Sequence, residues 1–390
     1  MLTRRHLLQQ GLRVTAASQV ALLSAPLAGC VPRNHALSGL SSLSQTEITG
    51  PRSLKAHASA SHLFAGAAVD VTVLQNDPMY RLVLAEQFNM VVAEREMKWK
   101  TLRPAPDRYT FTLADTLMTF ARRHKMKVRG HNFVWHEALP DWFASTVTKS
   151  NARQFLVDHI MTVGQRYQGK IHSWDVVNEA VLPSDGRTDG LRKSPWLDLL
   201  GPSYLETAFR TAREADPHAL LTYNDYGVEY DNTEDDQRRF YILQLLQRLK
   251  STGVPLDAVG IQAHIKAVAK DSIGKGLRDF MSAIRAMGLK IFVTELDVNE
   301  DDIATNDVTV RDKIIADTYT QFLSVAMQEP ALKAVLTWGV NDAHTWLNNG
   351  PTHKKKQPDR PQRSLPFDND DQPKPAYFAL RESFDRRVPS

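Results

Sequence analysis

The sequence predicts an α/β fold, a single (β/α)8 TIM barrel. Eight short apolar runs of strand type occur between residues 63 and 338, and amphipathic segments of helical length separate them. Polar or aromatic residues follow nearly every run at its C-terminal end. Regular alternation of strands and helices over about 320 residues favours one parallel barrel over two separate domains.

The predicted elements follow one another along the chain without an internal repeat. We expect the strands at residues 63–69, 88–93, 127–131, 171–177, 220–224, 258–262, 290–294 and 334–338. The clearest helix is expected over residues 233–250, where Asn232 or Thr233 can cap the N-terminus and acidic residues fill the first turn. Its apolar residues recur at helical spacing, at Phe240, Leu243, Leu246 and Leu249.

The C-terminal ends of the strands collect polar and aromatic residues, and this is the end at which barrels of this kind carry their active sites. A purely structural barrel has no reason to place such groups there. The residues in question are Glu94, Lys98, His131, Trp135, His136, Asn178, Glu179, Asn224, Asp225, Tyr226, Gln262, His264, Glu295, Asp297, Trp338, Asn341 and Asp342.

Two of these residues, Glu179 and Glu295, each follow an apolar run of strand type. In a parallel barrel both carboxyl groups would enter one cleft. Two such carboxyl groups are the minimum requirement for hydrolysis of a glycosidic bond. Taken alone, however, a glutamate at a strand end is more often a helix cap or a member of a surface ion pair.

Seven motifs in order resemble glycoside hydrolase family 10, the endo-β-1,4-xylanases, over roughly residues 60–385. A single one of these motifs would be a weak signal, but their order along eight strands is specific. The motifs are Gly130-His131-Asn132-Phe133-Val134-Trp135-His136, Trp174-Asp175-Val176-Val177-Asn178-Glu179, Tyr223-Asn224-Asp225-Tyr226, Gln262-Ala263-His264, Gly288 to Asp297, Trp338-Gly339-Val340-Asn341-Asp342 and Pro373-Lys374-Pro375-Ala376-Tyr377.

The resemblance implies a retaining mechanism, with Glu295 as nucleophile and Glu179 as acid/base, and with carboxyl groups about 5–5.5 Å apart. His264 is expected to bond Glu295 and keep it ionised, which would make Glu179 harder to ionise. Asn178 resembles the residue that holds the sugar 2-hydroxyl. The other substrate-binding residues that the resemblance implies are Glu94, Lys98, His131, Trp135, Tyr226, Gln262, Trp338 and Trp346, while Asp297 is either a support residue or a helix cap.

Other roles for some of these side chains stay open. His131 and His136 could be core histidines or a metal pair, but a spacing of five places them on opposite faces of a continued strand, and no further ligand pattern accompanies them. We expect no metal and no cofactor, and we interpret His136 as structural. The three tryptophans could fill the core or stack on sugar rings.

The chain departs from the family at Arg95, where the motif Glu94-Arg95-Glu96-Met97-Lys98 has arginine in place of an asparagine that contacts the −2 sugar. Arginine only donates hydrogen bonds, so sugar binding there is in doubt. Arg95 either pairs with a neighbouring acid such as Glu96 or recognises an acidic substituent. A basic run after the eighth strand, residues 353–356 with Arg360, is a solvated loop or a second such contact.

The basic character of the whole chain comes largely from its first residues. The net charge is +4 and the pI near 9.0, but Arg4, Arg5 and Arg13 lie within residues 1–29, which contain no acid. The rest of the chain has a net charge of +1. This leaves no broad basic surface for nucleic acid, which we do not expect as a partner.

Residues 1–29 are predicted to be an export signal. Thr3-Arg4-Arg5-His6-Leu7-Leu8 resembles the bacterial twin-arginine pattern, and the apolar stretch after it is too short and polar to span a bilayer. Leu27-Ala28-Gly29-Cys30 resembles a lipobox. We therefore expect lipidation of Cys30, the single cysteine, and anchoring to a membrane, in the periplasm or at the cell surface.

The remaining sequence divides at about residue 60. Residues 30–60 are rich in Ser, Ala, His and Gly and are predicted to be a lipid-anchored flexible tether, and residues 61–390 the catalytic domain, a monomer acting on xylan. Two other functions are weighed against this one. The chain could hydrolyse other β-1,4-glycans, such as cellulose-type or mixed-linkage glucans, or it could be a non-catalytic glycan-binding lipoprotein.

Overall fold

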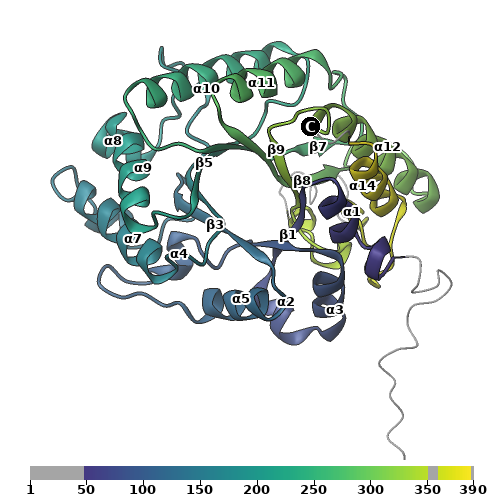
Figure 1. The fold of residues 1–390 in the computed structure, drawn as a ribbon. Coiled ribbons are helices and arrows are strands. Elements are labelled where there is room, and N and C mark those ends of the chain that lie inside the picture. The colour runs from purple at the N-terminus through teal and green to yellow at the C-terminus, as the bar shows by residue number, and fades with distance from the viewer. Residues whose placement is uncertain (1–47, 350–358, 388–390) are drawn as a thin grey trace, which may run out of the picture. The chain divides into compact units, whose positions relative to one another are not determined.

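A closed ring of eight parallel strands forms the centre of the protein (Figure 1). The computed structural model describes residues 48–349 and 359–387. Neighbours in the ring follow the order β6-β5-β4-β3-β2-β1-β9-β8, and pairing of β6 with β8 closes it. The strands are β1 Phe64–Val69, β2 Met90–Ala93, β3 Lys127–Val134, β4 Ser173–Asn178, β5 Leu220–Asp225, β6 Ala258–Ile261, β8 Lys290–Asn299 and β9 Leu332–Thr337, with β7 His264–Lys266 outside the ring.

Each of the eight predicted strand regions overlaps one strand of the ring, so the predicted barrel is confirmed. The additional strand, β7, pairs only with the C-terminal half of β8, where His264 is opposite Asp297. This pairing explains why β8 continues to Asn299, five positions beyond the predicted end. A three-residue strand has too few positions for an alternating pattern to be recognised in the sequence.

Helices surround the ring on its outer side (Figure 1). Their apolar faces pack against the outer faces of the strands, and a smaller cluster of Ala68, Met90, Val92, Phe292 and Leu336 fills the inside of the ring. The helices are α1 Leu54–Ala60, α2 Val71–Asn76, α3 Pro78–Gln87, α4 Trp99–Leu102, α5 Thr112–Arg123, α6 Phe143–Thr146, α7 Ala152–Arg166, α8 Pro195–Leu200, α9 Ser203–Ala215, α10 Thr233–Ser251, α11 Lys275–Ala286, α12 Val308–Ala326 and α14 Pro375–Asp385, with short 3-10 turns at Gly50–Arg52, Pro183–Asp185, Asp342–His344 and Trp346–Asn349.

Helix α10 matches the predicted helix within one residue, and Asn232 is its cap, accepting a hydrogen bond from the Asp235 N–H. The predicted apolar face is only partly correct. Phe240 is 54% exposed. The buried face instead runs through Ile242, Leu245, Leu246 and Leu249.

The predicted tether is wrong for residues 48–60. Helix α1 lies in this segment and contacts α14, β1 and α3, with Leu54 and Ala58 completely buried. The side chain of Gln87 accepts a hydrogen bond from the Leu54 N–H and donates one to the Ile48 carbonyl. Folded structure therefore begins at least twelve residues before the predicted boundary.

The predicted export signal, Cys30 and the first part of the tether lie outside the described residues. Within the described part of the chain, no helix combines the length and the hydrophobicity needed to cross a membrane.

Candidate active site

A cavity of about 500 Å³ lies at the C-terminal ends of the barrel strands. All twelve residues predicted to act in catalysis or substrate binding line it, and Arg95 and Glu137 complete its wall. The twelve are Glu94, Lys98, His131, Trp135, Asn178, Glu179, Tyr226, Gln262, His264, Glu295, Trp338 and Trp346. A larger cavity of about 690 Å³ lies between α5 and α7 and includes none of them.

Glu295, on β8, is 4% exposed and is held by two hydrogen-bond donors. Its Oε2 is 3.3 Å from His264 Nε2, and its Oε1 accepts a hydrogen bond of 2.8 Å from Asn224 Nδ2. Burial by itself would raise the pKa of Glu295. The bond from His264 and the charges of His131, His264 and Lys98 outweigh burial and lower the pKa to about 2, so the carboxylate is ionised and available as a nucleophile.

His264 is fixed from its other side by Asp297, as expected for a support residue. Asp297 Oδ1 is 2.9 Å from His264 Nδ1, and Asp297 Oδ2 accepts a hydrogen bond of 2.7 Å from Trp346 Nε1. Burial would lower the pKa of His264, but the charge and hydrogen bond of Asp297, together with the bond to Glu295, raise it well above its ordinary value. A cationic His264 between two carboxylates results.

Glu179 follows β4 and has a positive φ of 57°, an uncommon conformation for a residue other than glycine. Its Oε1 accepts hydrogen bonds of 3.0 Å from Asn178 Nδ2 and from Gln262 Nε2. Its Oε2 is 3.9 Å from both His136 Nδ1 and Arg192 Nη2. The carboxyl group thus has one oxygen fixed by neutral amides, while the other lies 3.9 Å from an imidazole and a guanidinium group.

Two asparagine side chains connect the glutamates. Asn224 Nδ2 contacts both Glu295 Oε1, at 2.8 Å, and Asn178 Oδ1, at 2.9 Å, and Asn178 reaches Glu179 from its own amide nitrogen. Thr294 Oγ1 donates to Asn224 Oδ1, which fixes the direction of the Asn224 amide. The carboxyl groups are therefore held on one short network of buried amides.

Lys98 lies against two aromatic rings, with its Nζ 4.7 Å from the centre of the Trp135 ring and 5.6 Å from that of Trp338. Burial lowers the pKa of Lys98. The negative charges of Glu295, Glu94 and Glu179 raise it, but they do not outweigh burial. The pKa of Glu94 rises to about 7, mainly through burial. A lysine, a buried acid and flat apolar rings beside the two glutamates suit a polyhydroxylated ring ligand.

The sequence model of Glycosyl hydrolase family 10 matches residues 53–383. The chain belongs to this family. It is 33% identical over 330 residues to endo-1,4-beta-xylanase B of Thermotoga neapolitana, covering 84% of this chain and 89% of that protein. The crystal structure of xylanase 10B from Thermotoga petrophila RKU-1 in complex with xylobiose is 33% identical, with a TM-score of 0.76 over 86% of this chain and 97% of that one.

Some relatives are much longer proteins. The exoglucanase XynX of Acetivibrio thermocellus is 36% identical over 331 residues, and the match covers 81% of this chain but only 28% of XynX.

At Arg95, the position where this family 10 protein departs from the expected motif, the side chain pairs with Asp70 at the end of β1. The predicted partner Glu96 instead accepts a hydrogen bond from the Arg95 backbone N–H. Glu96 was therefore the wrong partner for the guanidinium group, although the expectation of a neighbouring acid holds. The Arg95 side chain remains 56% exposed at the cavity wall, so part of it can still meet a ligand.

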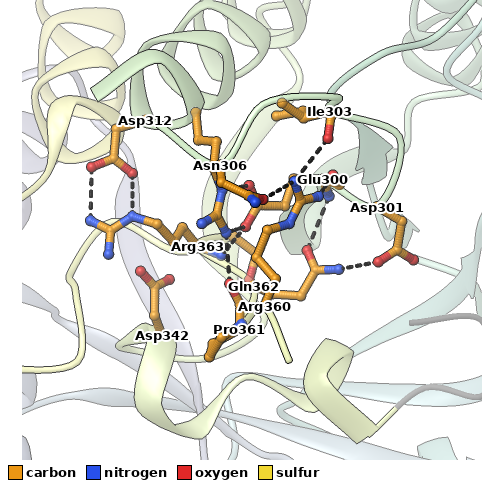
Figure 2. A network of polar contacts seen from close by, with 12 residues as sticks. Glu300, Asp301, Ile303, Asn306, Asp312, Asp342, Arg360, Pro361, Gln362 and Arg363 are labelled. Carbon is orange, nitrogen blue, oxygen red and sulfur yellow. Dashed lines mark hydrogen bonds and ion pairs between the residues drawn. The ribbon is translucent and has the colours of Figure 1, made fainter. Parts of the chain in front are cut away.

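A network of charged groups fixes the loops after β8 and β9 (Figure 2). The Arg311 guanidinium bonds both oxygens of Glu300, and Arg363 bonds both oxygens of Asp312. Arg360 donates to the carbonyls of Glu300, Ile303 and Thr305. Arg360 is thus a structural residue, contrary to its predicted place in a solvated basic loop, while residues 353–356 lie outside the described residues.

Three groups around the glutamates were not predicted as functional. Asn224 belongs to a motif that the sequence shows, so its role could have been inferred from its strand end. His136, for which the resemblance gave no substrate role, was interpreted as structural; it follows β3, which ends at Val134, and its Nδ1 lies 3.9 Å from Glu179 Oε2. Arg192, which also bonds the Glu179 carbonyl and the Tyr226 hydroxyl, lies in a long loop with no recognisable pattern.

Proposed function

We propose that this protein hydrolyses internal β-1,4-xylosidic bonds of xylan with retention of anomeric configuration. One observation carries this proposal: two glutamates reach one cavity from β4 and β8 in different surroundings. The low pKa of Glu295 suits a nucleophile. Glu179, bonded on one side by neutral amides, suits a group that must both give and take a proton.

In the first step the Glu295 carboxylate attacks the anomeric carbon while Glu179 transfers its proton to the glycosidic oxygen. The carbon–oxygen bond to the leaving sugar breaks, and a glycosyl ester with Glu295 forms. In the second step the Glu179 carboxylate takes a proton from water, whose oxygen attacks the same carbon and releases Glu295. Asn178 and His131 would contact the hydroxyls of the −1 sugar, the position at which the bond breaks.

The retaining mechanism is tested by following the anomeric configuration of the first products from a xylo-oligosaccharide by NMR. We expect the β anomer to form first and then mutarotate. Early formation of the α anomer would require a water between carboxylate and sugar, and thus an inverting enzyme. The short network of Asn224 and Asn178 between the glutamates supports the smaller separation.

Specificity for xylan over glucan is the finer part of the proposal. Xylose lacks the C5 hydroxymethyl group of glucose, and Trp338 and Trp346 line the cavity next to His264, with ring centres 6.4 and 5.2 Å away. These rings would crowd a larger sugar. Initial rates on xylan and carboxymethylcellulose, measured side by side, test this, and equal rates would favour a general β-1,4-glycanase.

An endo mode of attack predicts that the viscosity of a xylan solution falls faster than reducing ends appear. The alternative of a non-catalytic glycan-binding protein predicts no release of reducing ends at all. The presence of both glutamates in one cavity favours an enzyme.

We also infer export by the twin-arginine route and lipidation of Cys30, supported by the motifs around Arg4 and Arg5 and before Cys30. Metabolic labelling with a fatty-acid analogue in a bacterial host should label the wild type, and Cys30→Ser should abolish both the label and membrane association. Retention of Cys30→Ser in the membrane fraction would contradict the anchor. Light scattering tests the expectation of a monomer.

A further inference from the structure

The turn between β6 and β7 lies between the two glutamates. Gln262 bonds Glu179 through its side chain and accepts a hydrogen bond from the Glu295 N–H through its carbonyl. Two residues later, His264 bonds Glu295 and Asp297. Since these neighbouring side chains reach different glutamates, the conformation of the one residue between them, Ala263, decides where both point.

Ala263 has a positive φ of 63° and is completely buried. This left-handed conformation costs an L-residue with a Cβ of the order of 1 kcal/mol or more, so the surroundings must impose it. The Ala263 N–H donates to a side chain from the loop after β5. A buried N–H without an acceptor would add a further cost, and so the group that accepts this hydrogen bond stabilises the turn.

The acceptor is Glu229, which lies in the loop after β5 and is 2% exposed. Its Oε1 accepts a hydrogen bond of 3.1 Å from the Ala263 N–H, and its Oε2 accepts one of 2.8 Å from the Val228 N–H. The same loop makes a second contact with the segment, because the Tyr230 hydroxyl accepts a hydrogen bond of 2.7 Å from the Lys266 N–H. The loop after β5 thus forms hydrogen bonds with the turn at Ala263 and with β7 at Lys266.

The chemistry of this site favours a carboxyl group. The two N–H groups bond different oxygens of Glu229, and glutamine would place an NH2 donor at one of these two positions. Burial, and to a lesser degree the charge of Asp235, raise the pKa of Glu229 to about 7. The carboxyl group therefore occupies a position where its ionisation is unfavourable. Glu229 does not line the cavity, and direct contact with a substrate does not account for it.

We propose that Glu229 is a positioning residue for both catalytic glutamates, acting through its hydrogen bond to the left-handed Ala263 that sets Gln262 against Glu179 and His264 against Glu295. The proposal rests on the proposed glycosidase function. It assigns to the loop after β5 a role in the reaction that sequence position alone does not indicate.

The test compares Glu229→Gln, which keeps one acceptor oxygen, and Glu229→Leu, which keeps none, with Asp216→Asn as a matched control. Asp216 is also a completely buried carboxylate that accepts backbone hydrogen bonds, from Gly169 and His218, but at the opposite end of the barrel. The full-length chain is used throughout. Readouts are Tm, kcat, KM and the pH profile of kcat/KM on a xylo-oligosaccharide.

We expect kcat to fall by about tenfold in Glu229→Gln and further in Glu229→Leu. A displacement of the catalytic groups by about 1 Å can lower the rate by about a hundredfold, so losses of this size are reasonable. The acidic limb of kcat/KM should move to higher pH, because a displaced His264 no longer lowers the pKa of Glu295. Asp216→Asn should lower Tm without either change. If Glu229→Leu does not fold, Glu229→Gln alone decides.

The proposal is overturned if Glu229→Gln keeps the kcat and the acidic limb of the wild type, or if it changes only Tm or only KM, as a merely structural loop residue would. Absence of retaining hydrolysis in the wild type would instead reject the proposed function, so the two failures are distinguishable.

Discussion

The ends of β8 and β4 carry the same side chain in different surroundings. At β8, Glu295 is bonded by the cationic His264 and by Asn224, and the charges of His131 and Lys98 add to this. At β4, Glu179 is bonded by two neutral amides, and the Arg192 guanidinium is 3.9 Å away.

The difference lies in the type and distance of the donors more than in burial, since the Glu295 and Glu179 side chains are 6% and 12% exposed. A charged donor at hydrogen-bond distance stabilises the carboxylate form of Glu295 more strongly than a neutral amide would. These surroundings support the proposed division of roles, with Glu295 as the nucleophile and Glu179 as the acid/base of a retaining mechanism.

Exchange of each glutamate for alanine is the most direct test of this division. On an aryl β-xylobioside whose leaving group needs no protonation, Glu295→Ala should lower kcat by about 10⁴-fold or more, because the nucleophile is lost. Glu179→Ala should still form the glycosyl ester but release it slowly. Azide should accelerate Glu179→Ala and give the β-azide, and an α-azide from this variant would reverse the assignment.

Removal of the charged donor should make the end of β8 resemble that of β4. His264→Gln keeps a hydrogen-bond donor but loses the charge, so burial should raise the pKa of Glu295 from about 2. Because Glu295 must be ionised to attack, the acidic limb of kcat/KM should shift to higher pH, with kcat lowered by about ten- to a hundredfold. An unshifted limb in this variant would show that His264 does not set the ionisation of Glu295.

A smaller effect is expected when only the partner of Asp297 is lost. Trp346→Phe keeps an aromatic ring at the cavity but removes the 2.7 Å hydrogen bond to Asp297. We expect kcat/KM to fall by about fivefold, equivalent to about 1 kcal/mol for one hydrogen bond. Trp346→Ala, as a control, should raise KM further, and equal KM values in the two variants would exclude stacking by this ring.

The smallest effect is expected away from both glutamates, at Arg95. Because Asp70 engages its guanidinium, Arg95→Asn should leave kcat and the rate ratio between glucuronate-decorated and plain xylan unchanged, with a loss of stability below about 1 kcal/mol. Asp70→Asn is the matched variant, since asparagine can still cap α2. A ratio that changes in Arg95→Asn would instead assign Arg95 to an acidic substituent.

The barrel and its two glutamates could be predicted because both depend on local patterns. Apolar runs define strands, and the C-terminal ends of parallel strands meet at one end of a barrel, so Glu179 and Glu295 had to come together. The resemblance of the motifs supplied their roles. Sequence patterns indicated far less about the supporting groups, which come from loops and have no periodicity.

Arg192 and Glu229 illustrate this limit. Each lies in a loop, and each acts through a contact that forms only when distant segments pack: Arg192 with Glu179, Glu229 with Ala263. Helix α1 was missed for a related reason, since its seven residues bury only Leu54 and Ala58 and show no clear apolar face.

The pairing of β1 with β9 has a consequence for how the chain folds. Phe64 lies beside Ala334, and α1 packs on α14, so the first strand meets its second neighbour only when nearly the whole polypeptide is available. Contacts so distant along the chain slow folding, and until they form β1 has one open edge that could pair with another molecule. Ring closure is therefore the step at which we expect synthesis, chaperones and aggregation to compete.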